Sequence, residues 1–280
     1  MSGSSEAAKR RSGEAEELNS PILASSPPHL LAPSPSPRLW EVDTLRGVAI
    51  VLMLIYHFTW DLVYFGLYQA NLLAGPWQWF ARGIATIFIF VMGISLTLSD
   101  TRERRRLGQP PSFKKYLGRG GKIFGLGLLV TVGTYFFIGR GFVIFGILHL
   151  LGLSIILAYP FLRSSPWVNL VAGLVVIVAG IYVDRLVVSY PWLIWLGVKQ
   201  AGIYMVDYYP VLPWFGLSLL GIFAGYSLYP QGVRHFALPN LAAFPLVRGL
   251  RFLGRHSLLI YVIHQPILIG LLVVLGFGSF

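Results

Sequence analysis

The chain has 280 residues, of which 55% are hydrophobic and only 12% are charged, whereas about a quarter of the residues in an ordinary soluble domain carry charge. The apolar residues fall in separate runs of about 20 residues, each long enough to cross a bilayer as a helix. A water-soluble globular fold is therefore excluded, and the sequence predicts an all-α, polytopic transmembrane helix bundle of about seven helices.

The formal net charge of the chain is +11 at neutral pH. The lysines and arginines lie in short connections between the apolar runs, so they indicate membrane topology and not nucleic acid as a partner. The chain has no cysteine, which excludes a disulfide framework, a thiolate nucleophile and a zinc site with sulfur ligands. We expect no metal cofactor.

The first 39 residues differ from the rest in composition. They are a mixture of Ser, Pro, Ala and Glu, without the sustained apolar run of a signal peptide. Such a composition is typical of disorder. We therefore expect residues 1–39 to form a cytoplasmic tail and residues 40–280 to form the transmembrane domain.

Hydrophobic runs predict seven spanning helices and a short amphipathic segment at the membrane surface near residues 190–198. The connection from Asp100 to Lys122 is strongly basic, so the positive-inside rule predicts that it lies in the cytoplasm. By alternation, the N-terminus is then cytoplasmic and the C-terminus lies outside. The predicted helices are residues 46–66, 78–99, 121–138, 142–161, 167–188, 211–229 and 256–277.

Two other connections agree with this orientation. The basic connection 230–255 falls inside, and the uncharged connection 67–77 falls outside. We expect a multi-pass protein of the plasma or inner cell membrane, with the lipid bilayer as its first partner. A homo-oligomer is compatible with the sequence.

The first helix carries polar residues along one face, and charge within a span marks a functional site by default because it costs at least a few kcal/mol. At about 100° per residue, Asp43, Arg46, His57, Asp61 and Tyr64 lie within about 60° of one another. The helix rises about 16 Å from Arg46 to His57. This places the arginine at the cytoplasmic mouth and the imidazole near the middle of the membrane.

Such a face lines either a cavity or a polar seam between helices. The alternative to a catalytic role is a structural network, in which Asp61 or a backbone carbonyl holds His57 without any chemistry. The spacing alone leaves both interpretations open.

Further polar residues occur in or beside the predicted spans. They are His149 in FGILH, His264 in YVIHQP, Arg82 in FARGIA and Asp207 before YPVLPW. A single histidine in a helix is more often a packing residue than a catalyst, and Arg82 and Asp207 could simply anchor helix ends. Trp214 lies near a predicted outer boundary and could be an interfacial anchor or shape a pocket.

Several segments together resemble the catalytic domain of heparan-alpha-glucosaminide N-acetyltransferase and its bacterial relatives, within the wider group of transmembrane acyltransferases. The segments are EVDTLRGVAIVLMLIYHFTWDL, FIFVMGISLTLS, FGILHLLGLS, DYYPVLPWFGLSLLGIFAG and LGRHSLLIYVIHQPIL. The resemblance covers roughly residues 38–278.

The resemblance implies transfer of an acetyl or other acyl group from cytoplasmic acetyl-CoA to a sugar or polymer acceptor at the other face. In the wider group, an arginine followed eleven residues later by a histidine marks the first helix, and here that pair is Arg46 and His57. His57 would then be the catalytic base or a transient acyl carrier. Asp61, His149 and His264 would orient it.

For an acyltransferase of this kind we also predict the residues that bind the two substrates. The donor phosphates would contact Arg46, beside Asp43, together with Arg119 and Lys122 of the cytoplasmic connection. The acceptor would contact Arg82, Asp207 and Trp214.

One segment departs from the namesake, whose catalytic histidine lies in the lumenal loop after the first helix. The matching stretch here, YQANLLAGPWQW, has no histidine, so we expect an acceptor other than heparan-derived glucosamine. A transporter or flippase with a polar relay, and a scaffold held by glycine contacts such as Gly216, Gly221 and Gly225, are the alternatives to an enzyme. The acceptor, the acyl chain length, an acyl-histidine intermediate and the oligomeric state stay open.

Overall fold

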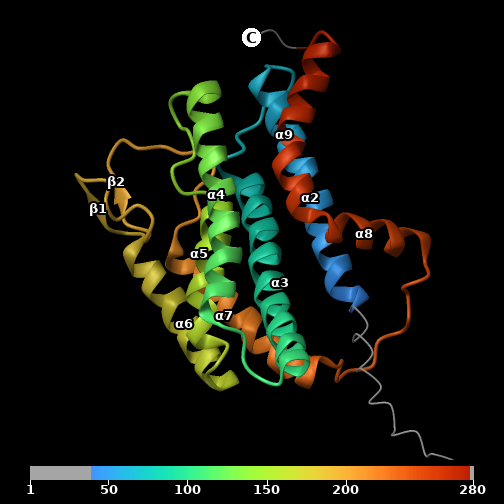
Figure 1. Ribbon diagram of the computed structural model, residues 1–280. Helices are drawn as coiled ribbons and strands as arrows, with labels where there is room; N and C mark the ends of the chain where they lie inside the picture. Colours follow the sequence, from blue (N-terminus) through green and yellow to red (C-terminus); the bar gives the residue numbers. More distant parts are fainter. Residues whose placement is uncertain (1–38, 278–280) are drawn as a thin grey trace, which may run out of the picture. The chain divides into compact units, whose positions relative to one another are not determined.

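The computed structural model describes residues 39–277, so all of the predicted tail except Leu39 lies outside the described residues. Figure 1 gives the element labels used below. The elements are α2 (Trp40–Tyr64), α3 (Gly75–Leu107), α4 (Phe113–Ile138), α5 (Ile147–Phe161), α6 (Pro166–Val183), β1 (Val187–Val188), β2 (Lys199–Gln200), α7 (Val211–Leu228), η1 (Pro230–Gly232), α8 (Pro245–Arg255) and α9 (Ser257–Val274).

The all-α, polytopic fold is confirmed. Within residues 39–277, six helices are long and apolar enough to cross a membrane, namely α2, α3, α4, α6, α7 and α9. The shorter α5 is also apolar and brings the apolar helices to the predicted seven. Helix α8 is the one that the sequence did not predict.

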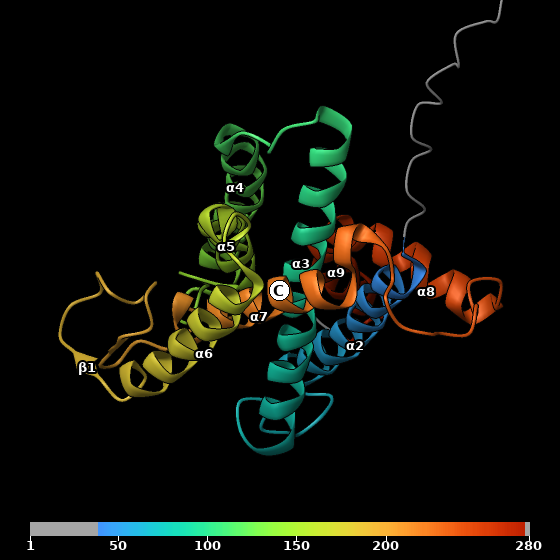
Figure 2. The same ribbon diagram turned by 90° about the horizontal axis from the view of Figure 1, so that it is seen from below.

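Helices α3 and α7 pack against each other and lie between two groups of helices (Figure 2). On one side, α6 packs against α7 and α4 packs along α5. On the other side, α2 packs against α3, α8 and α9. The polar face predicted on the first helix therefore lies in the group formed by α2, α8 and α9.

Glycines allow neighbouring helices to approach closely, as is common in membranes. A Cβ atom on Gly216 of α7 would meet the backbone of Gly173 on α6, and one on Gly221 would meet the backbone of α3. Gly225 faces the side chain of Thr97. The glycine contacts proposed for helix association are thus present, and they lie in the group around α7, away from α2 and α9.

The basic connection between the second and third predicted helices is mostly helical. Helix α3 continues to Leu107 and ends at Gly108, whose φ of 68° is accessible to glycine without strain. Asp100 stabilises this extension by accepting hydrogen bonds of 2.5 Å from both Arg104 Nε and the Tyr116 hydroxyl. The hydrogen bond to Tyr116 also joins α3 to α4. Since α3 ends at Leu107 and α4 begins at Phe113, the connection between them is only residues 108–112.

Two predicted connections have local structure that the sequence did not specify. The amphipathic segment 190–198 forms turns between β1 and β2, which pair in parallel. The connection 230–255 contains the amphipathic helix α8, which lies across α2 (Figure 1). Cβ atoms on Gly47 and Gly254 would collide with the facing backbones of α8 and α2, so these glycines permit the contact.

Candidate functional site

Two histidines from the first and last described helices meet inside the bundle. The ring of His57 on α2 and the ring of His264 on α9 lie edge to face, with their centroids 4.6 Å apart. His264 is 7% exposed, whereas His57 is half-buried. His264 is therefore the less accessible of the two side chains.

A backbone carbonyl of the preceding turn holds each imidazole. Nδ1 of His57 lies 3.0 Å from the Met53 carbonyl oxygen, and Nδ1 of His264 lies 2.7 Å from that of Tyr261. Because a carbonyl oxygen only accepts, the neutral rings carry their hydrogen on Nδ1 and keep a lone pair on Nε2. Nε2 of His264 is buried without a hydrogen-bond partner among residues 39–277. The pair presents two basic nitrogens.

A carboxylate and an amide lie next to the two histidines. Gln265 Nε2 donates a hydrogen bond to Oδ1 of Asp61, which is 2% exposed. Within the described chain, Oδ2 of Asp61 and Oε1 of Gln265 are buried without partners. Asp61 follows His57 by one turn and Gln265 directly follows His264, so the two pairs lie along one seam between α2 and α9. Asp61 bonds to Gln265, and the Met53 carbonyl holds His57.

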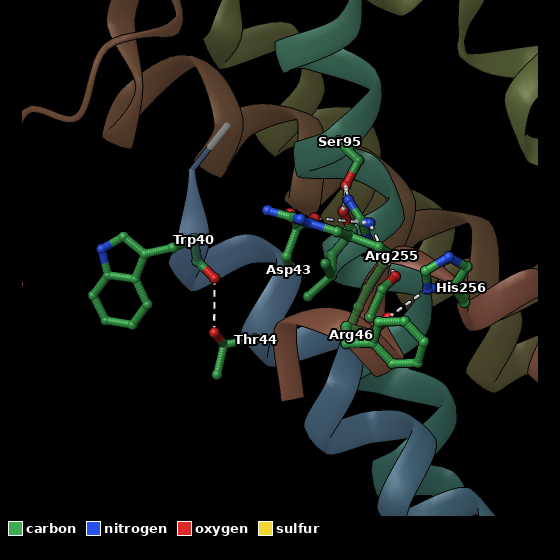
Figure 3. Close-up of polar contacts among 10 residues, drawn as sticks. Trp40, Asp43, Thr44, Arg46, Ser95, Arg255 and His256 are labelled. Atoms are coloured by element: carbon green, nitrogen blue, oxygen red, sulfur yellow. Dashed lines mark hydrogen bonds and ion pairs between the residues drawn. The ribbon is translucent and has the colours of Figure 1, made fainter. Parts of the chain in front are cut away.

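Arg46, near the start of α2, joins this helix to α3 and α8. Its Nη2 donates to Ser95 Oγ at 2.9 Å, and its Nη1 lies 3.2 Å from Asp43 Oδ1 and 3.4 Å from the Gly254 carbonyl oxygen. Asp43 Oδ2 also lies 3.4 Å from Nε of Arg255. Figure 3 shows Arg46 and Arg255 reaching toward Asp43 and Ser95. One carboxylate lies between two guanidiniums, so this group keeps a positive charge.

Apolar side chains fill the face of α2 between Arg46 and His57. Ile50 and Met53 lie within about 40° of Arg46 around the helix, and they are 0% and 2% exposed. Both pack in a core cluster with Ile84 of α3. The predicted polar face is thus interrupted, and a substrate arm that follows it must displace Met53, whose unbranched side chain adapts readily.

Asp207 precedes α7 and contacts the start of α5, where its Oδ2 accepts a hydrogen bond of 3.1 Å from the Ile147 N–H. Burial raises the pKa of this carboxyl to about 6, and the Ile147 N–H opposes the shift. Tyr56, Tyr209 and Tyr261 lie within electrostatic range of Asp207. Because these tyrosines come from α2, the loop before α7 and α9, Asp207 links the two groups of helices.

The other two residues predicted to bind the acceptor lie around Tyr209. The ring of Trp214 contacts the Tyr209 ring with centroids 4.8 Å apart. Arg82 is exposed, places its guanidinium carbon 5.4 Å from the Trp79 ring centroid and interacts electrostatically with Tyr209. Trp214 thus contacts Tyr209 directly, whereas Arg82 and Asp207 lie within electrostatic range of Tyr209.

His149 belongs to a different cluster, formed by α4 and α5. It is 1% exposed, its Nδ1 accepts a hydrogen bond of 3.2 Å from the Gly146 N–H, and its Nε2 lies 3.4 Å from Thr131 Oγ1. Its ring also packs edge to face on Phe124. These contacts cap the start of α5, and none of them involves His57.

Arg119 and Lys122 are exposed on α4. Helix α4 packs along α5, whereas Arg46 contacts α3 and α8. The structure therefore does not gather the predicted donor-binding residues into one cluster.

Sequence reasoning missed Gln265, Ser95 and Arg255. Gln265 follows His264 directly, and a polar pair within an apolar run was a usable signal. Ser95 gave no signal, because a serine in a span usually bonds to its own helix backbone, as Ser95 also does with the Val91 carbonyl. Arg255 was interpreted only as a topology signal, because residues 230–255 were assigned to a cytoplasmic connection.

Comparison with family models found a match, and comparisons with curated proteins and with solved structures found none. Residues 38–266 match the family described as heparan-alpha-glucosaminide N-acetyltransferase, catalytic. This match includes α2 with Arg46 and His57, and α9 as far as Pro266. The chain is thus a membrane protein that belongs to the heparan-alpha-glucosaminide N-acetyltransferase catalytic-domain family.

Proposed function

We propose that the chain is a membrane acyltransferase that moves an acetyl or other acyl group from acyl-CoA on the cytoplasmic side to a sugar or polymer acceptor on the far side. The observation that carries this proposal is the contact between His57 and His264. Two imidazoles with free Nε2 lone pairs, buried between apolar helices, are suited to proton transfer and to nucleophilic attack.

In this mechanism the half-buried His57 acts on the reacting groups. Its Nε2 takes the proton of the acceptor hydroxyl or amine while that group attacks the thioester carbon, the C–S bond breaks, and the proton passes to the departing coenzyme A thiolate. Alternatively, Nε2 itself attacks the thioester carbon and coenzyme A leaves as the thiolate. The acceptor then attacks the acyl-imidazole, and its proton goes to the thiolate. The Met53 carbonyl keeps the hydrogen on Nδ1 in either case. His264 provides a second basic nitrogen next to it, and the buried Asp61 Oδ2 can accept a hydrogen bond from the acceptor.

The donor enters at the end of α2 that carries Arg46. The planar N–H donors of a guanidinium match the geometry of a phosphate. The Arg46 side chain is 26% exposed despite its contacts to Asp43 and Ser95. The acyl group then has to travel about 16 Å along α2 to reach His57. Displacement of Met53 is the step that opens this path.

The acceptor site is proposed around Tyr209, which contacts Trp214 and lies within electrostatic range of Arg82 and Asp207. Aromatic rings and a carboxylate are suited to a polar ring compound, because the rings contact its apolar face and the carboxylate accepts from its hydroxyl or amine groups. Asp207 reaches α2 and α9 through Tyr56 and Tyr261. An acceptor bound there would lie on the His57 side of Met53.

The purified protein in nanodiscs tests this function through free thiol released from acetyl-CoA and label transferred from the acetyl group to added sugars. We expect both, in equal amounts. A transporter would instead move a labelled solute across liposomes without consuming acetyl-CoA. Neither thiol nor labelled product, across a panel of amino and neutral sugars, would contradict the proposal.

A further inference from the structure

Helix α8 carries a row of arginines beside Arg46 that the proposed function has not used. At about 100° per residue, Arg248, Arg251 and Arg255 lie within about 60° of one another, with Phe252 beside them. The row is about 10 Å long at 1.5 Å per residue. It ends at Arg255, which shares Asp43 with Arg46.

These guanidiniums keep most of their hydrogen-bonding capacity. Arg248 donates to the Ala243 carbonyl at 3.3 Å and Arg251 donates to the Ala242 carbonyl at 3.1 Å. Each guanidinium has five N–H donors, and Nε of Arg251 is buried without a partner among residues 39–277. The row can therefore receive several anionic oxygens.

The local charge balance is positive. Of the two acidic residues in the first turn of α2, Glu41 is held by Arg234 through hydrogen bonds of 2.8 and 2.6 Å. Among residues 39–277, Asp43 pairs with both Arg46 and Arg255, whereas Arg248 and Arg251 donate to backbone carbonyls. Several guanidiniums in one row favour a ligand with more than one phosphate.

An exposed aromatic ring lies beside the row. Phe252 is 62% exposed, and its ring lies 4.4 Å from that of His256, measured between centroids. A nucleobase stacks on such a platform, whereas inorganic phosphate gains nothing from it. Arginines together with an aromatic platform match a nucleotide better than a phosphate alone.

We propose that α8 is the binding site for the nucleotide part of the acyl donor, with Arg248, Arg251 and Arg255 on its phosphates and Phe252 against its base. This inference rests on the proposed function, because it identifies which surface holds the donor. It replaces Arg119 and Lys122, which lie on α4, as the partners of Arg46 in phosphate binding. The thioester end is then free to extend from Arg46 toward His57.

The test measures binding of adenosine 3′,5′-bisphosphate, the nucleotide fragment of coenzyme A, to the full chain in zwitterionic nanodiscs. We expect saturable binding that coenzyme A displaces. Arg248→Gln and Arg251→Gln should each weaken it about tenfold, and Phe252→Ala should weaken it at least as much. Arg248→Lys, which keeps the charge but loses the planar fork, should lie between Arg248→Gln and the parent.

Two sets of controls separate α8 from other basic surfaces. Arg105→Gln and Arg106→Gln on α3 remove equivalent exposed charges and should leave nucleotide binding unchanged. Arg119→Gln with Lys122→Gln should also leave it unchanged. Unchanged binding in the α8 variants, or a loss confined to the α4 variant, would overturn the proposal, provided that melting temperatures show each variant to be folded.

A further measurement distinguishes a nucleotide from a lipid headgroup as the source of the phosphate. If α8 binds lipid headgroups, the parent protein will not bind the nucleotide in zwitterionic nanodiscs, and the α8 substitutions will change only its retention of anionic lipid. This result would overturn the proposal.

A second measurement separates the α8 site from the proposed acyl transfer. With acyl-pantetheine, a donor that lacks the nucleotide, the α8 variants and the parent should turn over equally. Nucleotide binding without any thiol release would contradict acyl transfer but leave the α8 site standing.

Discussion

His57 and His264 contact each other edge to face across the seam between α2 and α9, with 4.6 Å between ring centroids. Each ring uses Nδ1 to bind the carbonyl of its own helix, so each neutral ring keeps a lone pair on Nε2. Polar seams of this kind are rare between apolar helices, because an unsatisfied polar atom is costly in hydrocarbon. The buried and unpartnered Nε2 of His264 is therefore better explained by chemistry than by packing.

Replacing His264 by Asn tests that explanation. The Asn side chain can still donate to the Tyr261 carbonyl, as Nδ1 does now, but it has no basic nitrogen at the position of Nε2. We expect turnover to fall about a hundredfold or more with little change in melting temperature. Thiol release and thermal unfolding of the same preparation measure both effects. A destabilised variant with normal turnover per folded molecule would assign His264 to structure alone.

Replacing Arg46 by Ala should raise the apparent KM for the acyl donor more than it lowers kcat. The reason is that Arg46 lies at the donor end of α2, about 16 Å from the reacting groups at His57. Initial rates at varied acetyl-CoA and fixed acceptor separate the two constants. A change confined to the acceptor KM would show that the donor has been placed at the wrong end.

Asp207 should make stability depend on pH. Burial raises its pKa from 3.8 to about 6 in the folded protein, so the folded state binds the proton more tightly than the unfolded state. The free energy of unfolding should then rise as the pH falls from about 6 to about 4, because the folded protein takes up more protons in this window.

The Asp207→Asn variant isolates this contribution, because Asn can still accept the Ile147 N–H. Its melting temperature in detergent should exceed that of the parent above about pH 6, and the difference should disappear toward pH 4. A constant difference between the two proteins across this range would show that Asp207 does not titrate there.

Gly254→Ala should separate α8 from α2. A Cβ atom at this position would collide with the Asp43 carbonyl oxygen, so α8 must move and the pair of Asp43 with Arg255 should weaken. We expect the donor KM to rise, while the contacts of α6 with α7 stay intact because they lie in another group of helices. Gly249→Ala on the same helix is the control, since its Cβ meets no atom within 4 Å. Equal effects of the two substitutions would contradict the account.

The sequence alone predicted the helical architecture because hydrophobic runs of spanning length have few alternative structures. The shared face of Arg46 and His57 was also predictable, because it depends only on helical periodicity. The burial of the apolar residues on that face was not predictable from the sequence. Helical periodicity places Ile50 and Met53 on this face, but only the packing of α3 and α9 against α2 shows that they are buried between the arginine and the histidine.

Helix α8 was missed for a different reason. The segment 245–255 contains three arginines, Arg248, Arg251 and Arg255. They indicate an amphipathic surface helix, but the positive-inside rule explains the same arginines as part of a cytoplasmic loop. Pairings across the sequence, such as His57 with His264 and Asp61 with Gln265, depend on which helices become neighbours. Spacing along one helix carries no information about them.

The most direct test of acyl transfer at the histidine pair is the time course of thiol release from acetyl-CoA by the parent protein and by His57→Ala in the same nanodiscs. With a productive acceptor present, the parent should release thiol continuously, and the variant should be slower by about a hundredfold to ten-thousandfold while remaining folded and inserted. Equal rates for the two proteins would contradict a catalytic role for His57.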